Sequence, residues 1–470
     1  MAYKTDTIAT ISTGLSDSGI GIVRVSGEDA ITIVDRIFRS PKEGKSLAKV
    51  KGNTIHYGFI YDENKLIDEV MAVVLKAPRS YTTENTVEIN CHGGVLMVQK
   101  ILETVLKTGA RMAEPGEFTK RAFLNGRIDL SRAEAVIDVI HSQNEYALRA
   151  GTNQLRGNLY EAVSQMRKKL IYEIAFIESA IDDPEHISLD GFYDRIIKIV
   201  TELIEEIEKM IQSADSGKLI KEGIRTVILG KPNVGKSSLM NLIVGSEKAI
   251  VTNVAGTTRD VLEENIRIHG LGLNIVDTAG IRNTEDVVEK IGVERALSCA
   301  ESADLIVYVV DSSTELDAND FDIIDFIRDK KVIILLNKSD MKEITDENDL
   351  RSAIEGRFKN ISSDDVVMIK TSAKDRTGLD EFETAVRNMF FQGKIPMDDE
   401  IVITNLRHKE ALMDACDSLK LVLKAAREEM PEDFLSIDLM NAYSSLGYII
   451  GEEVGDDLIN EIFSKFCMGK

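Results

Sequence analysis

The stretch Thr226-Val-Ile-Leu-Gly-Lys-Pro-Asn-Val-Gly-Lys-Ser-Ser-Leu-Met-Asn-Leu-Ile243 determines the fold of the central part of this chain. It begins with a short apolar run typical of a buried strand and ends in a pattern typical of a helix. Between them lies a loop of the form G-x-x-x-x-G-K-[ST], whose backbone N–H groups and helix N-terminus attract phosphate. We therefore predict a phosphate loop in which Lys236 contacts the β- and γ-phosphates and the Ser237 hydroxyl ligates Mg²⁺.

The segment around this loop, residues 218–385, alternates apolar runs with helical patterns. The runs after the loop are Leu305–Val310, Val332–Leu336 and Val366–Ile369. Such alternation predicts a doubly wound, mainly parallel sheet covered by helices, with its ligand site at the carboxyl ends of the strands.

The residues after the last two runs indicate which base is bound. Asp340 of Asn337-Lys-Ser-Asp340 offers a carboxylate that accepts hydrogen bonds from N1–H and the 2-amino group of guanine. Adenine has neither donor there, so ATP would leave the carboxylate unpaired at a cost of several kcal/mol. Together with Ser372-Ala-Lys374, these residues predict GTP as the nucleotide.

Two further motifs follow the phosphate loop in the order expected of a nucleotide switch. Gly256-Thr-Thr-Arg-Asp260 offers Thr257 or Thr258 to Mg²⁺, and Asp277-Thr-Ala-Gly280 offers a carboxylate and a glycine that senses the γ-phosphate. The full predicted GTP site is Asn233, Val234, Gly235, Lys236, Ser237, Ser238, Thr252, Asn253, Val254, Ala255, Gly256, Thr257, Thr258, Asp277, Thr278, Ala279, Gly280, Asn337, Lys338, Asp340, Ser372, Ala373 and Lys374, with Ser237 and Thr258 on Mg²⁺.

Two usual catalytic parts are missing from these motifs. Ile281 occupies the position where many GTPases carry a water-orienting glutamine, and its side chain forms no hydrogen bond. Arg259 and Arg282 lie nearby, but arginines in such segments are more often solvated or structural than catalytic. The Asn233 amide oxygen, with carbonyls of the Thr252–Thr257 loop, can instead hold a monovalent cation beside the phosphates.

Length and composition set the limits of the remaining chain. The 470 residues suggest about three domains, and no apolar run or signal-like N-terminus favours a membrane, so we expect a cytoplasmic protein. Acidic and basic residues balance in 1–120, so the net charge of −22 lies in 121–470. Since an acidic surface repels nucleic acid, RNA is expected to dock on the N-terminal part or through a partner.

Three compositional regimes predict a multidomain α/β plus all-α architecture. Residues 1–118 mix strands such as Gly19–Val25 with helices and form an N-terminal α/β domain. Residues 119–217 and 386–470 read as a discontinuous helical bundle, with apolar residues at three- and four-residue steps. The Ras-like P-loop GTPase domain, 218–385, is inserted into this bundle.

Motifs along the whole chain resemble the MnmE (also called TrmE) family of tRNA-modification GTPases. The resemblance includes Ile250–Asp260 and Asp277–Gly292 in the GTPase domain, and Ser80–Gly94 and Pro115–Leu130 before it. At the end of the chain, Phe466-Cys-Met-Gly-Lys470 is similar to the family's terminal F-C-[IM]-G-K.

The resemblance implies how GTP is hydrolysed without the missing glutamine and arginine. Glu289 is then the catalytic residue that orients the attacking water, although from sequence alone a solvated carboxylate is an alternative. K⁺ supplies the positive charge, held by Asn233, Thr252, Val254 and Thr257. The family forms homodimers through its N-terminal domain, and its GTPase domains pair transiently.

The resemblance also implies a folate site in the N-terminal domain. Its residues are Arg24, Glu88, Arg127 and Lys470, and its ligand is 5-formyltetrahydrofolate or a related folate. Cys467 corresponds to the family's near-terminal cysteine, for which a chemical role and a packing role both stay open.

The implied reaction adds an aminomethyl-type group to C5 of the wobble uridine of certain tRNAs. A flavoprotein partner of the MnmG/GidA type brings FAD, and a heterotetramer is expected. Two alternatives remain from sequence: a ribosome-assembly GTPase that binds rRNA without modification chemistry, and a one-carbon transferase that GTP only regulates. The acidic helical region argues against the first, which calls for a basic RNA-binding appendage.

Overall fold

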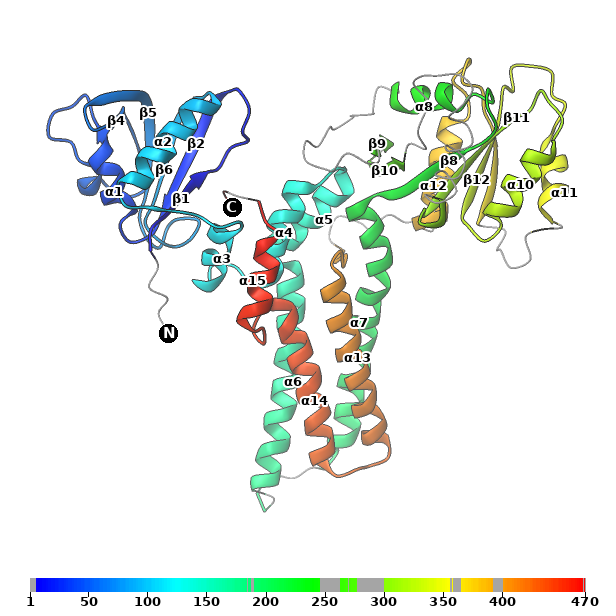
Figure 1. Ribbon diagram of the computed structural model, residues 1–470. Coiled ribbons are helices and arrows are strands. Elements are labelled where there is room, and N and C mark those ends of the chain that lie inside the picture. The colour runs from blue at the N-terminus through cyan, green and yellow to red at the C-terminus, as the bar shows by residue number, and fades with distance from the viewer. Residues whose placement is uncertain are drawn as a thin grey trace. The chain divides into compact units, whose positions relative to one another are not determined.

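The computed structural model describes residues 6–183, 185–186, 190–245, 263–268, 270–276, 300–355, 357, 365–391, 400–467 and 469 (Figure 1). The chain divides into two compact units. The first comprises Met1–Ile140, Gln154–Ile196 and Leu421–Lys470, and the second comprises His141–Asn153 and Ile197–Lys420. In the described part of the chain, no helix has the length and apolar composition that a membrane span requires.

The N-terminal part of the first unit is an α/β domain, as predicted. Seven strands of its described residues form one sheet in the order β3-β4-β5-β6-β2-β1-β7, antiparallel except for the β1–β7 pair. The apolar residues of helices α1 and α2 pack on one face of this sheet. The bounds are β1 Ile8–Ile11, β2 Ser18–Ser26, α1 Ala30–Ile37, β3 Phe38–Arg39, η1 Leu47–Lys49, β4 Thr54–Asp62, β5 Lys65–Leu75, β6 Thr86–Gly93, α2 Val95–Lys107 and β7 Arg111–Met112.

Helices make up the rest of the first unit. They are α3 (Glu117–Leu124), α4 (Leu130–His141), α6 (Asn158–Asp182), α14 (Glu432–Ile450) and α15 (Asp456–Ser464). The guanidinium of Arg167 on α6 lies 4.0 Å from the ring centre of Tyr443 on α14, within a long helix–helix contact. Phe463 and Phe466 pack with Leu130, so the C-terminal segment is anchored on α4.

The second unit contains the doubly wound sheet predicted from the phosphate loop outward. Six described strands lie in the order β13-β12-β11-β8-β10-β9, all parallel except the β9–β10 hairpin. Apolar clusters cover both faces, and every residue of β11 and β12 is buried. The bounds are β8 Ile224–Leu229, α8 Lys236–Gly245, β9 Glu263–Ile268, β10 Leu271–Val276, β11 Leu305–Asp311, α10 Ala318–Ile327, β12 Val332–Asn337, α11 Glu347–Glu355, β13 Val366–Lys370 and α12 Leu379–Phe391.

Four of the described helices contain residues of both units: α4, which ends at His141, α5 (Glu145–Arg156), α7 (Phe192–Glu222) and α13 (Leu406–Arg427). The predicted fold class, α/β parts combined with helices and a Ras-like P-loop domain, is confirmed. The sheet is mainly parallel because the buried runs of β8, β11 and β12 are mostly apolar, and such strands are stable between two helical layers.

Candidate functional site

The phosphate loop joins the end of β8 to the start of α8. Gly230 and Gly235 have φ values of +148° and +98°, which side chains with a Cβ rarely adopt. A Cβ at Gly230 would lie 2.4 Å from the carbonyl oxygen of Val309, and one at Gly235 would lie 2.2 Å from Nδ2 of Asn337. Both positions therefore require glycine, and the loop keeps the bare backbone that a phosphate group needs.

The loop closes around the ammonium group of Lys236. Its Nζ donates to the carbonyl oxygens of Gly230 and Lys231, at 2.6 Å each. Asn233, the proposed cation ligand, is exposed and has a φ of +63°. Ser237 follows Lys236 in the first turn of α8, so the donor types and the helix N-terminus fit a magnesium-bound triphosphate.

An ion-pair network fixes the loop to the rest of the sheet. Lys231 Nζ lies 2.5 Å from Asp320 and 3.0 Å from Asp317, at the start of α10. Asp320 is buried and also accepts a hydrogen bond of 2.8 Å from the hydroxyl of Tyr308 on β11. Sequence reasoning did not identify this network, because its partners come from separate elements.

The predicted base-recognition residues meet at the ends of β12 and β13. Asp340 accepts a hydrogen bond of 3.0 Å from Ser372 Oγ and lies 3.5 Å from Lys374 Nζ. The Ser372 hydrogen bond and the Lys374 charge, opposed by partial burial, hold the pKa of Asp340 below its ordinary value. The carboxylate is therefore ionised at neutral pH, as guanine recognition requires.

Asn337 connects the base loop with the phosphate loop. Its Nδ2 donates to the carbonyl oxygen of Val234 at 2.8 Å, and its Oδ1 accepts from the backbone of Ala373 at 3.4 Å. Lys338 follows with a φ of +64° and donates to Asp311 at 2.5 Å. The structure thus brings together the described members of the predicted GTP site.

Other predicted positions lie outside the described residues. They are Thr252, Asn253, Val254, Ala255, Gly256, Thr257, Thr258, Asp277, Thr278, Ala279, Gly280, Glu289 and Lys470, as well as Arg259, Ile281 and Arg282. Within the described ranges, no cluster of three or more His, Cys, Asp or Glu residues forms a metal site. Of the predicted Mg²⁺ and K⁺ ligands, Ser237 and Asn233 lie within the described residues.

In the N-terminal domain, Arg24 and Glu88 face each other across the strand pair β2–β6. Their register makes them cross-strand neighbours, and Arg24 Nε donates to Oε1 of Glu88 at 2.8 Å. Arg24 also donates to the carbonyl oxygen of Gly469 at 3.1 Å, which ties the C-terminal tail to these strands. The structure therefore brings Arg24 and Glu88 together and places the Gly469 carbonyl beside them.

Arg127, another predicted residue of this site, contacts Tyr81. Its Cζ is 4.7 Å from the Tyr81 ring centre, and its Nη1 donates to the Tyr81 carbonyl oxygen at 3.1 Å. Arg24 Cζ lies 5.6 Å from the same ring centre. Both guanidinium groups thus contact the Tyr81 ring. Sequence reasoning did not single out Tyr81 within the Ser80–Gly94 motif.

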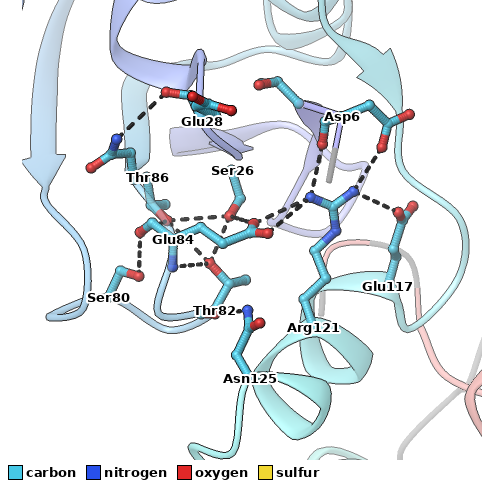
Figure 2. A network of polar contacts seen from close by, with 12 residues as sticks. Asp6, Ser26, Glu28, Ser80, Thr82, Glu84, Thr86, Glu117, Arg121 and Asn125 are labelled. Carbon is cyan, nitrogen blue, oxygen red and sulfur yellow. Dashed lines mark hydrogen bonds and ion pairs between the residues drawn. The ribbon is translucent and has the colours of Figure 1, made fainter. Parts of the chain in front are cut away.

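The loop that carries Tyr81 is held by a buried polar network (Figure 2). Arg121 on α3 donates to both oxygens of Glu84 at 3.2 Å and to Glu117 at 2.9 Å. Ser26 donates to Glu84 at 2.7 Å, and Asn125 donates to the carbonyl oxygen of Thr82 at 2.7 Å. The network fixes residues 78–86 against β2 and α3.

Cys467 lies beside the start of α3. Cys467 is exposed, and its carbonyl oxygen accepts a hydrogen bond of 3.4 Å from the backbone of Gly116. Cys91 differs from it, because burial raises the pKa of its thiol to about 11 and disfavours the reactive thiolate.

The fold and the described site define a P-loop protein that binds guanine nucleotide. The model of the MnmE helical domain matches residues 130–467, and the model of the GTP-binding protein TrmE N-terminus matches residues 7–127. The tRNA modification GTPase MnmE of Lachnoclostridium phytofermentans is 54% identical over 99% of this chain and 100% of its own length. That of Clostridioides difficile is 46% identical over 99% of both chains.

This chain belongs to the tRNA modification GTPase MnmE family, and the predicted enzyme class, a GTP hydrolase, is confirmed. A solved structure of an Aquifex aeolicus Era variant bound to GDP and AlF4⁻ is 28% identical. It covers 42% of this chain and 67% of its own, with a TM-score of 0.27.

Proposed function

We propose that this protein is a K⁺-stimulated GTPase that modifies C5 of the wobble uridine of certain tRNAs with a folate one-carbon unit. Its partner is an FAD-binding flavoprotein of the MnmG/GidA type, and the product carries an aminomethyl or carboxymethylaminomethyl group. The observation that carries this proposal is the pairing, in one chain of the MnmE family, of a guanine-nucleotide site with the Arg24–Glu88–Gly469 cluster.

In GTP hydrolysis, this chain's residues bind and orient. Lys236 holds the β- and γ-phosphates, Ser237 and Thr258 hold Mg²⁺, and Glu289 orients the attacking water. K⁺, held by Asn233, Thr252, Val254 and Thr257, supplies positive charge where other GTPases use an arginine. Such a charge matters because an arginine finger changes rates by about 10³–10⁵.

The folate part of the proposal rests on the chemistry of the N-terminal cluster. Arg24 occupies Oε1 of Glu88, which leaves Oε2 to accept hydrogen bonds from the N–H edge of a pterin. Arg127 offers a planar guanidinium to the carboxylates of the glutamate tail, and Lys470 reaches the same ligand. Cys467 takes part in the chemistry of this site.

The larger assembly also belongs to the proposal. The chain forms a homodimer through its N-terminal domain, with transient pairing of GTPase domains, and a heterotetramer with the flavoprotein in the cytoplasm. The domain limits remain 1–118, 119–217 with 386–470, and 218–385. A net charge of −22 makes the partner the natural source of most tRNA contacts, because nucleic-acid affinity depends on cationic side chains.

The decisive experiment measures modified nucleosides in tRNA from a strain that lacks this protein. We expect the C5 modification of the wobble uridine to disappear and to return with the wild-type gene but not with Lys236→Ala. The surface variant Lys65→Ala is the matched control and restores modification. Normal tRNA in the deletion strain, together with copurification of a ribosomal subunit, would instead support the ribosome-assembly function.

A second measurement tests the cation. GTP turnover is expected to be much faster in K⁺ than in Na⁺ at equal ionic strength, because the smaller ion fits the Asn233 site poorly. Equal rates in the two salts contradict K⁺ stimulation and leave the tRNA assignment to be judged by the nucleoside measurement.

A further inference from the structure

A pocket of about 500 Å³ lies beside the Arg24–Glu88 cluster in the N-terminal domain. Its walls include Leu75, Pro78, Arg79, Tyr81, Asn125 and Arg127. The volume falls within the range of roughly 300–1,000 Å³ that is typical of small-molecule sites. The pocket therefore has the size of a ligand site and combines an aromatic and apolar wall with two guanidinium groups.

The two arginines of this pocket have no acidic partner in the described part of the chain. Arg127 donates to the Tyr81 carbonyl oxygen and contacts its ring, and Arg79 has only its backbone N–H bonded, to Lys76. Elsewhere in this domain, arginines such as Arg24, Arg111 and Arg121 pair with carboxylates. Two unpaired guanidinium groups in one pocket of an acidic protein indicate an anionic ligand.

Tyr81 links this pocket to the Arg24–Glu88 cluster. Its ring centre lies 5.6 Å from Arg24 Cζ and 4.7 Å from Arg127 Cζ, so a ligand passing over Tyr81 meets both sites. A folate bound with its pterin at Glu88 would place its benzoyl ring near Tyr81 and its glutamate at Arg127. Any further glutamate would then lie at Arg79.

We propose that this pocket binds the γ-linked glutamates beyond the first, so that the protein prefers oligoglutamyl folates over the monoglutamate. The inference rests on the proposed folate function and extends it to Arg79. Each additional glutamate adds one carboxylate that is ionised at neutral pH and that a guanidinium can bind through two hydrogen bonds. A tRNA phosphate is the competing anion, but the apolar and aromatic lining of this open pocket, with Leu75, Pro78 and Tyr81, suits a small ligand better than a helical backbone.

The test compares the dissociation constants of 5-formyltetrahydrofolate as the monoglutamate and as the triglutamate, by titration calorimetry on the full-length protein. An exposed arginine–carboxylate pair contributes up to about 1 kcal/mol, so we expect the triglutamate to bind about fivefold more tightly. The ratio of the monoglutamate to the triglutamate dissociation constant should fall toward one in Arg79→Ala and should decrease at high salt. Lys65→Ala, which removes an exposed charge at the opposite end of β5, should keep it.

The other outcomes separate the two proposals. Equal binding of both folates by the wild type, or an undiminished preference in Arg79→Ala, overturns the tail pocket while the folate site stands. No binding of either folate overturns the folate function and the tail pocket together. If Arg79→Ala weakens tRNA binding and keeps the triglutamate preference, the pocket serves RNA phosphate and the inference is wrong.

Discussion

Replacing Arg121 by Met should destabilise the N-terminal domain more than any other single loss of charge in its polar network. The Arg121 side chain is 7% exposed and holds Glu84 and Glu117, which are 10% and 12% exposed (Figure 2). Met keeps the apolar stem and removes only the guanidinium. The two carboxylates then lose a partner that water cannot fully replace.

The expected size follows from this burial. Breaking a buried ion pair by removing one partner costs about 3–5 kcal/mol, whereas an exposed pair contributes about 0–1 kcal/mol. Arg111→Met is the matched control, because Arg111 binds Glu117 and Asp6 from a position that is 42% exposed. We therefore expect the free energy of unfolding to fall by about 3–5 kcal/mol in Arg121→Met and by about 1 kcal/mol or less in Arg111→Met.

Acidic pH should reduce the difference in unfolding free energy between the wild type and Arg121→Met. Burial raises the pKa of Glu117, but hydrogen bonds from Arg111, Glu114 and Arg121 outweigh it, so the net pKa is lowered. A lowered pKa contributes stability above the unfolded value, about 4.3 for Glu, and that stability is lost as pH falls through the folded value. Wild type and variant should therefore converge as the pH falls through the folded pKa of Glu117, which lies below the unfolded value.

Urea denaturation at several pH values, with hydrogen exchange of residues 78–86 as the local readout, measures both effects. Equal losses of unfolding free energy in Arg121→Met and Arg111→Met would show that burial does not control the energy of this network. A difference that grows as pH falls would refute the assignment of ionised carboxylates around Arg121.

Three other substitutions test the remaining sites. Asp340→Asn should weaken GTP binding about 100-fold, from the loss of charge-assisted hydrogen bonds, and improve binding of xanthosine triphosphate, as measured with fluorescent nucleotides. Lys231→Met leaves the buried Asp320 without its cation and should lower the thermal stability of the GTPase domain by about 1–3 kcal/mol; an unchanged melting curve contradicts this. Gly116→Ala, at a φ of +69° and with a Cβ 2.5 Å from the Phe463 carbonyl oxygen, should release the C-terminal tail to proteolysis, and an equally protected tail would show that it docks without this contact.

Much of the nucleotide site could be predicted because its information is local. The glycine spacing in Gly230–Ser237 fixes a loop between one strand and one helix, and Asn337–Asp340 directly follows the buried run of β12. In each case, neighbouring residues dictate the backbone shape that the chemistry needs. Arg24 and Glu88 were predicted differently, by resemblance of the surrounding motifs to a known family.

Contacts between distant segments were not predictable from local residue patterns, and only the family resemblance placed Lys470 in one site with Arg24. Asn337 fixes the Val234 carbonyl from 103 residues away, and Arg24 binds the Gly469 carbonyl across 445 residues. Neither leaves a periodic or spaced signal, because the partners become neighbours only when strands and helices pack. The same holds for Arg121, whose sequence surroundings resemble those of an ordinary solvated helix residue.

The sequence by itself determined the phosphate loop, the guanine preference and the mainly parallel character of the central sheet, since short-range sterics, hydrogen bonding and the alternation of apolar runs with helical patterns decide them. Only the tertiary structure decided that the Tyr81 ring lies close to the guanidinium groups of Arg24 and Arg127. It also decided that Arg79 and Arg127 line one pocket. The reason is physical: charge and aromatic residues on separate loops acquire a common ligand surface only through the packing that brings those loops together.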